Sequence, residues 1–111
     1  MMCYTMAMDR LPARNLKAMA QKAEEAATLM RSLSHGGRLK VLCELSGGER
    51  SVGELVDLSA LSQSALSQHL AKLREDGLVA TRREGQAIFY RVADPKVLKV
   101  LRVLYELYCA A

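Results

Sequence analysis

The chain has 111 residues, with 16 basic against 12 acidic side chains, three cysteines and a formal net charge of +4. This length suits one domain with a modest core, and domains of this size are often completed by a partner subunit. The charge suits a polyanionic partner without requiring one. The N-terminal residues contain no apolar run that could serve as a signal peptide or membrane span, so we expect a cytoplasmic protein with no membrane partner.

The N-terminal region divides into a tail and a helix. We expect residues 1–14 to form a disordered tail and residues 15–111 to form a single domain. From Leu16 to Leu33, apolar residues recur at helical spacing. Half of these residues are alanines, whose small side chains permit another helix to pack closely against this one.

A second helix is expected from Arg38 to Leu45, where Leu39, Leu42 and Cys43 recur at spacing i, i+3, i+4. The pair of glycines that follows ends it. This spacing predicts that the Cys43 thiol lies on the inner side of the helix.

Two helices joined by a tight turn follow. The first runs from Ser51 to Leu58, and Glu54 completes a capping box with Ser51. Residues 59–61 are too few for anything but a sharp angle, so the second helix starts near Ser62. Its buried stripe has the spacing i, i+4, i+7 and consists of Leu66, Leu70 and Leu73.

A β-hairpin is expected next, with strands from Leu78 to Arg83 and from Ala87 to Val92 around a turn that contains Gly85. Arg82 and Arg83 lie near its tip, where two arginines suit phosphates or a narrow minor groove. The order is that of a helix-turn-helix followed by a wing.

The last helix begins with Asp94 as its cap and Pro95 at its first position. One polar strip consists of Lys96, Lys99, Arg102 and Glu106, and the rest of the helix is apolar. Such a helix must be buried on two sides, so we expect a homodimer formed by this helix and the first one. A membrane-associated helix is the alternative, which the short length and four charges disfavour.

Together these elements predict a mainly α fold with a β-hairpin wing: a winged helix-turn-helix with the order α-α-α-α-β-β-α. Its recognition helix would lie in the major groove of double-stranded DNA. Taken alone, the exposed face of this helix also fits a solvated surface, but the hairpin favours DNA. The expected base contacts are Gln63, Ser64, Ser67 and Gln68, and the expected backbone contacts are Lys72, Arg82, Arg83 and Arg91. For His69, packing and a phosphate contact are equally compatible with its position.

Nothing in the sequence indicates an enzyme. It contains no P-loop, no dinucleotide-binding glycine motif and no cluster of histidines with carboxylates. We therefore expect neither catalytic activity nor a bound cofactor. The two histidines are far apart in the sequence, and for His35, at a helix start, we expect a structural role.

The segments Ser32 to Leu45, Ser51 to Val79 and Arg82 to Val92 resemble the ArsR family of dimeric winged-helix repressors. They span most of the chain after residue 30, and the run SQSALSQHLAKLREDGLV is highly specific. Gly36 departs from the family pattern, which has proline after the histidine, and this loosens the start of the helix. The resemblance implies a homodimeric repressor that binds an inverted-repeat operator.

Many family members sense metals, and their sites can be compared with this chain. Where the arsenic- and cadmium-type motif has Cys-Val-Cys, this chain has Ser51-Val52-Gly53, so both thiolates are missing. The other common site uses histidine with carboxylates on the last helix, which here contains no histidine. We expect no divalent-metal site, although Cys43 and Cys109 with a third thiol could capture a thiophilic ion.

Cys43 in VLCEL and Cys109 in LYELYCAA resemble the cysteine pair of the BigR/SqrR subgroup, whose repressors respond to persulfides and related reactive sulfur species. The resemblance implies that operator DNA is released when reactive sulfur species bridge Cys43 and Cys109. Inert cysteines are one alternative, since cysteine is often a small buried apolar residue. A sensor of thiophilic metals or general oxidants is another, and so is a protein-interaction module without DNA binding. The role of Cys3 is left open.

Overall fold

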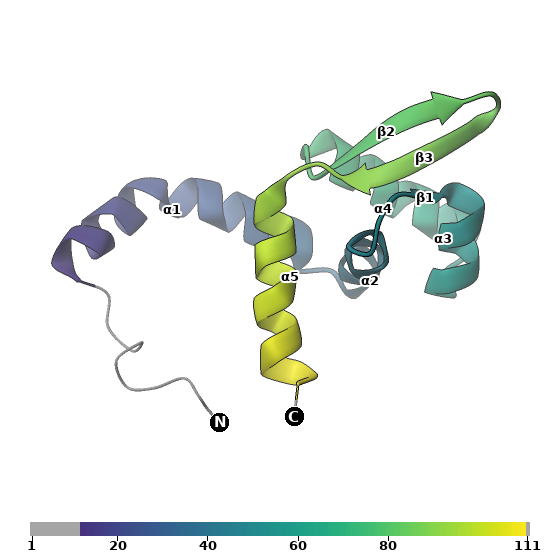
Figure 1. Ribbon diagram of the computed structural model, residues 1–111. Helices are drawn as coiled ribbons and strands as arrows, with labels where there is room; N and C mark the ends of the chain where they lie inside the picture. The colour runs from purple at the N-terminus through teal and green to yellow at the C-terminus, as the bar shows by residue number, and fades with distance from the viewer. Residues whose placement is uncertain (1–11, 111) are drawn as a thin grey trace. The chain divides into compact units, whose positions relative to one another are not determined.

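The computed structural model describes residues 12–110 of the chain (Figure 1). Residues 1–11, which include most of the expected tail and Cys3, lie outside the described residues, as does residue 111. By its contacts the chain divides into two compact units, one ending at Arg31 and the other beginning at Ser32.

The described part of the first unit is helical. Helix α1 runs from Ala13 to Leu33, so residues 13 and 14 are helical and do not belong to a tail. Leu16, Met19 and Met30 are each about half exposed, and no described residue of α1 before Ser32 is buried. The helix therefore carries apolar side chains that its own unit leaves uncovered.

The second unit contains the remaining elements: α2 (Gly36–Leu45), β1 (Arg50–Ser51), α3 (Val52–Ser59), α4 (Gln63–Glu75), β2 (Val79–Glu84), β3 (Ala87–Val92) and α5 (Pro95–Tyr108). Its three strands form an antiparallel sheet in the order β1-β3-β2. The predicted helices and hairpin are confirmed, and so is the winged helix-turn-helix. The expected element order lacked β1, because a strand of two residues leaves no periodic pattern in a sequence.

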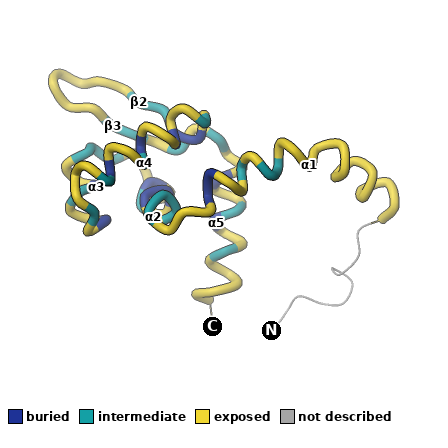
Figure 2. Tube along the Cα trace, turned by 180° about the vertical axis from the view of Figure 1, so that it is seen from behind, coloured by how far each residue is buried: buried dark blue, intermediate teal, exposed yellow. Residues whose placement is uncertain are grey.

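Leucines and valines build the core of the second unit. The predicted stripe of α4 is confirmed, since Leu66, Leu70 and Leu73 are at most 2% exposed. Leu42 of α2 and Leu55 of α3 are fully buried. Figure 2 shows the buried positions of α2 and α4 in dark blue. These contacts hold the outer face of α4 in a fixed orientation.

The prediction that Cys43 lies on the inner side of α2 is wrong. The helix buries Val41, Leu42 and Leu45, whereas Leu39 is half-buried and Cys43 is exposed. At 3.6 residues per turn, a stripe centred on these three residues places Cys43 on the opposite side. The spacing of Leu39, Leu42 and Cys43 fits a helix, but it selects the wrong face.

The turn between α3 and α4 has the sharp form expected. Ser51 and Glu54 form the predicted capping box at the start of α3, and Ser62 caps α4. Ala60 ends α3 with a φ of 59°, in the left-handed region. The buried hydroxyl of Ser59 accepts a backbone N–H of the turn. Local hydrogen bonds therefore fix the angle at which α4 leaves α3.

The wing is a regular hairpin, in which Gly85 has a φ of 61° at the turn. Because alternate residues point to opposite faces, the register divides its side chains into two groups. One face carries Val79, Thr81, Arg83, Ile88, Tyr90 and Val92, and the other carries Ala80, Arg82, Glu84, Ala87, Phe89 and Arg91.

Helix α5 begins as predicted, with Asp94 as the cap and Pro95 in the first turn. Val97 and Leu101 are its buried residues. Its exposed large apolar residues are Leu98, Val103, Tyr105, Leu107 and Tyr108, which are 42% to 81% exposed. Among residues 12–110, no helix has both the length and the apolar character that crossing a membrane requires.

Candidate nucleic-acid interface and thiol pair

The side chains predicted to contact bases share the outer face of α4. Gln63, Ser64, Ser67 and Gln68 are all exposed, and the helix buries its leucine stripe on the other side. Short hydroxyl and amide side chains permit close approach to base edges, where they can donate and accept hydrogen bonds. The arrangement has the chemistry that reading a major groove requires.

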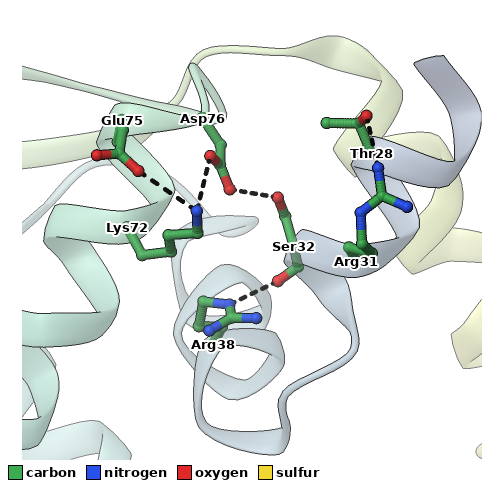
Figure 3. A network of polar contacts seen from close by, with 7 residues as sticks. All are labelled: Thr28, Arg31, Ser32, Arg38, Lys72, Glu75 and Asp76. Atoms are coloured by element: carbon green, nitrogen blue, oxygen red, sulfur yellow. Dashed lines mark hydrogen bonds and ion pairs between the residues drawn. The ribbon is translucent and has the colours of Figure 1, made fainter. Parts of the chain in front are cut away.

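Lys72, predicted to contact the DNA backbone, is exposed and lies in a polar network (Figure 3). Its Nζ lies 3.3 Å from Glu75 Oε1 and 3.4 Å from Asp76 Oδ1, and both acids raise the pKa of Lys72. Asp76 in turn accepts a hydrogen bond from the Ser32 hydroxyl. Arg38 donates to the Ser32 carbonyl at 2.7 Å. The network ties the C-terminal end of α4 to Ser32 and to the start of α2.

Arg82 forms ion pairs with two carboxylates of the same chain. Its guanidinium contacts Glu49 at 2.8 Å and Glu84 at 2.7 Å, and it lies 4.6 Å from the centre of the Phe89 ring. Hydrogen bonds to these two carboxylates raise the pKa of Arg82. A DNA phosphate would therefore have to compete with two carboxylates for Arg82.

Arg83 and Arg91 differ from Arg82. Both are exposed, and neither forms an ion pair with another residue in the described part of the chain. Their positive charges face solvent, so a phosphate could approach them without displacing a carboxylate. Of the two predicted arginines near the wing tip, Arg83 is thus the better placed for DNA.

The two histidines come together although they are far apart in the sequence. The His35 and His69 rings lie 4.6 Å apart, centre to centre, and His35 Nδ1 accepts the Gly37 N–H at 3.0 Å to cap α2. A Cβ on Gly37 would lie 2.4 Å from His69 Nε2, so a larger residue at position 37 would force this ring to shift. Sequence reasoning missed the pair because only the packing of α2 on α4 brings the rings into contact. This geometry favours a packing role for His69, and its phosphate contact stays a prediction.

The two described cysteines are both free and exposed. Partial desolvation of its sulfur raises the pKa of Cys43, and the neighbouring charges of Cys109 and Glu44 raise it further. Cys109 is thus close enough to Cys43 to act on it electrostatically. Burial raises the pKa of Glu44 also, and its Oε1 is buried with no hydrogen-bond partner among the described residues. The environment of Cys43 therefore favours its neutral thiol.

Metal ligands do not gather in the described part of the chain. Residues 12–110 contain no group of three or more histidine, cysteine, aspartate or glutamate side chains placed to hold an ion. Cys3, the third thiol that a thiophilic ion could use, lies outside these residues.

The sequence and fold match known regulators over most of the chain. A family model described as "Bacterial regulatory protein, arsR family" matches residues 35–81. The transcriptional activator HlyU of Vibrio cholerae is 46% identical over 97 residues, which cover 87% of this chain and 90% of that protein. The biofilm growth-associated repressor of Agrobacterium fabrum is 46% identical over 95 residues, which cover 86% of this chain and 81% of that protein.

A solved structure gives the same result. The crystal structure of the transcriptional repressor BigR from Xylella fastidiosa has a TM-score of 0.83 and 43% sequence identity, and the match covers 86% of this chain and 97% of that one. Sequence identity of this extent, combined with the same winged helix-turn-helix, is decisive for the family. The chain belongs to the ArsR family of DNA-binding transcription regulators and is not an enzyme.

Proposed function

We propose that the protein is a homodimeric repressor that binds an inverted-repeat operator and releases it when reactive sulfur species bridge Cys43 and Cys109. The observation that carries the sensing part is that Cys43 and Cys109 are both free and exposed. The raised pKa of Cys43, to which a charge on Cys109 contributes after desolvation, supports their proximity. Repression is supported by two of the relatives, which are named repressors, whereas HlyU is named an activator.

The DNA-binding part of the proposal assigns separate roles to α4 and the wing. Gln63, Ser64, Ser67 and Gln68 read base edges in the major groove, and Lys72, Arg83 and Arg91 hold the backbone. Arg82 contacts phosphate only after exchanging a carboxylate partner. Exposure of all these side chains supports the assignment.

The sulfur chemistry needs no oxidant besides the persulfide. The Cys109 thiolate attacks the outer sulfur of a persulfide RSSH and breaks its S–S bond. The thiol RSH departs, and Cys109 becomes a cysteine persulfide. The Cys43 thiolate then attacks Cys109 Sγ and expels hydrosulfide, which forms a disulfide. If Cys109 has first gained two sulfurs, attack on the middle sulfur forms a trisulfide and again expels hydrosulfide. We assign the first attack to Cys109 because the raised pKa of Cys43 favours its unreactive thiol.

A longer bridge relaxes the geometric requirement. A direct disulfide needs Cα atoms within about 7 Å, and each inserted sulfur extends the reach by up to about 2 Å. The sensor can therefore select a persulfide over peroxide by the separation of its two thiols. The bridge would couple α5 to α2, which packs under the recognition helix. A coupling of about 1 to 3 kcal/mol lowers operator affinity roughly 5- to 150-fold.

The test exposes the protein separately to peroxide, oxidised glutathione and a persulfide donor. Mass spectrometry identifies the bridge, and a duplex-binding assay measures release. Cys43→Ser and Cys109→Ser should each bind DNA and each fail to release it, and Cys3→Ser, the same change at the third cysteine, determines whether Cys3 takes part. A normal persulfide response from either pair variant would refute the two-thiol mechanism. Release by a thiophilic metal ion in the absence of persulfide would favour the metal-sensing alternative.

A further inference from the structure

A hollow of about 500 Å³ lies between α4 and the sheet of the wing. Ser67, Ala71 and Arg74 line it from α4, and Val52 and Tyr90 line it from α3 and β3. Ser67 and Ala71 have small side chains, so they leave the hollow open on the exposed face of α4. The DNA contacts proposed for the outer face of α4 and for the wing tip assign no role to Arg74.

DNA geometry gives this hollow a specific occupant. When a helix lies in a major groove and a wing reaches the adjacent minor groove, one sugar–phosphate strand separates the two grooves. That strand has to pass between the helix and the wing. In this protein α4 packs alongside the β2–β3 hairpin (Figure 1), and the hollow lies in the space between them.

The charges around the hollow suit a phosphate. Arg74 is exposed, and no residue in the described part of the chain forms an ion pair with it. Lys72 and Arg82, in contrast, are both paired with carboxylates. Glu75 also lines the hollow, and its Oε1 lies 3.3 Å from Lys72 Nζ, which it shares with Asp76. Arg74 is therefore the cationic side chain that lines the hollow, and it has no carboxylate partner among the described residues.

We propose that this hollow binds the sugar–phosphate strand of DNA between the two grooves, with Arg74 as the phosphate contact. Ser67 and Ala71 leave room for the strand, and Tyr90 forms the opposite wall. The inference rests on the proposed placement of α4 and the wing on DNA. It adds a backbone contact at Arg74, in the C-terminal part of α4, and Ser67 is the one proposed base-reading residue that also borders the hollow.

The test is the salt dependence of binding to mixed-sequence duplex DNA, because each phosphate contact contributes about 0.9 to the slope of log affinity against log salt. Arg74→Ala should lower the slope by about one per subunit. Arg74→Lys, which keeps the charge, should retain the slope. Arg102→Ala, the same change at an exposed arginine of α5, should also leave it unchanged.

A second variant tests the space and not the charge. Ala71→Leu should obstruct the hollow and weaken binding at every salt concentration, with thermal unfolding measured to verify that the variant folds. An unchanged slope in Arg74→Ala, alongside a lowered slope in Arg83→Ala, would overturn this inference and leave the proposed function standing. If the unmodified protein binds no duplex at low salt, the proposed function fails as well.

Discussion

The imidazole of His69 lies where α4 packs on α2, and its surroundings favour the neutral ring. Burial lowers the pKa of His69, and the neighbouring His35 and Arg38 lower it further. His35 caps α2 and Arg38 lies in its first turn, and each disfavours a positive charge on His69 at this contact. Protonation of His69 therefore weakens the support beneath the recognition helix.

We expect the protein to lose stability as the pH falls below about 6.5, the ordinary pKa of histidine. The folded state holds the pKa of His69 lower, so the unfolded chain binds this proton more readily. The stability that neutral His69 contributes is fully present above the pKa of histidine in the unfolded chain. It is lost as the pH falls through the lower pKa of His69 in the folded protein. Thermal unfolding at about pH 7.5 and 5.5 should show a smaller acid loss for His69→Gln than for the unmodified protein. An equal loss of stability in both proteins would show that titratable groups other than His69 cause the acid sensitivity.

Ala60 is the one non-glycine residue with positive φ in the described part of the chain. A residue with a Cβ loses about 1 to 2 kcal/mol of stability when its backbone adopts the left-handed region. Glycine avoids this strain, but its greater conformational freedom stabilises the unfolded chain and offsets part of the gain. Ala60→Gly should therefore raise the free energy of unfolding by roughly 1 kcal/mol. Ala71→Gly, the same change inside α4, should lower it by about as much. Denaturant unfolding measures both, and a loss at Ala60 would contradict the strain argument.

Arg82 marks a limit of sequence reasoning at the scale of a residue. The residue type and its place near the wing tip could be predicted from the hairpin pattern. Its main partner could not, because Glu49 lies before β1 and reaches Arg82 only when β1 pairs with β3. A two-residue strand has no sequence pattern, so the contact that it creates was not predictable. Cys43 was misplaced for a related reason, since the face that α2 buries depends on its tertiary neighbours.

At the scale of elements, α4 was the most predictable part of the chain. Its leucine stripe, its cap and the sharp turn before it follow from local spacing and turn chemistry. The network at its C-terminal end was not predictable, because Ser32 and Arg38 approach Asp76 and Lys72 only through long-range packing. Local pattern thus predicted which residues α4 exposes, and tertiary contacts decide how its end is held.

The different positions of α4 and the wing predict different effects on DNA binding. Gln68→Ala removes an amide from the outer face of α4 and should change the sequence preference, at a cost of about 1 to 3 kcal/mol for the preferred base. Arg83→Ala removes from the wing a charge that no described residue pairs, so it should weaken all duplexes similarly and lower the salt slope by about one. Binding to operator and random duplexes at several salt concentrations measures both effects. If the two variants act alike on both duplexes, this division of roles is wrong.

At the scale of the whole molecule, two helices leave apolar surface uncovered within their own units. Leu16, Met19 and Met30 are exposed on α1, and α5 exposes apolar side chains on both flanks of its buried stripe. The sequence could predict this excess, because the apolar residues of α5 cover more of its circumference than one core can use. It could not predict which of them face the core, and the structure places Leu101 there at 8% exposure. A substitution that tests dimer formation should therefore avoid Leu101.

Leu107 is the better position for that test, because it is 51% exposed on the flank of α5. If two copies bury this flank, Leu107→Glu places a charge in the interface and should yield monomers or aggregates, while the fold of each subunit persists. Lys99→Glu introduces the same side chain on the polar strip and should leave the dimer intact. Light scattering measures the mass, and a duplex-binding assay measures the operator affinity. In a dimer the two recognition helices should lie about 34 Å apart, which is one turn of DNA, so that both half-sites are bound. A monomer can engage only one half-site, so a well-folded Leu107→Glu monomer with full operator affinity would show that dimer formation is not required.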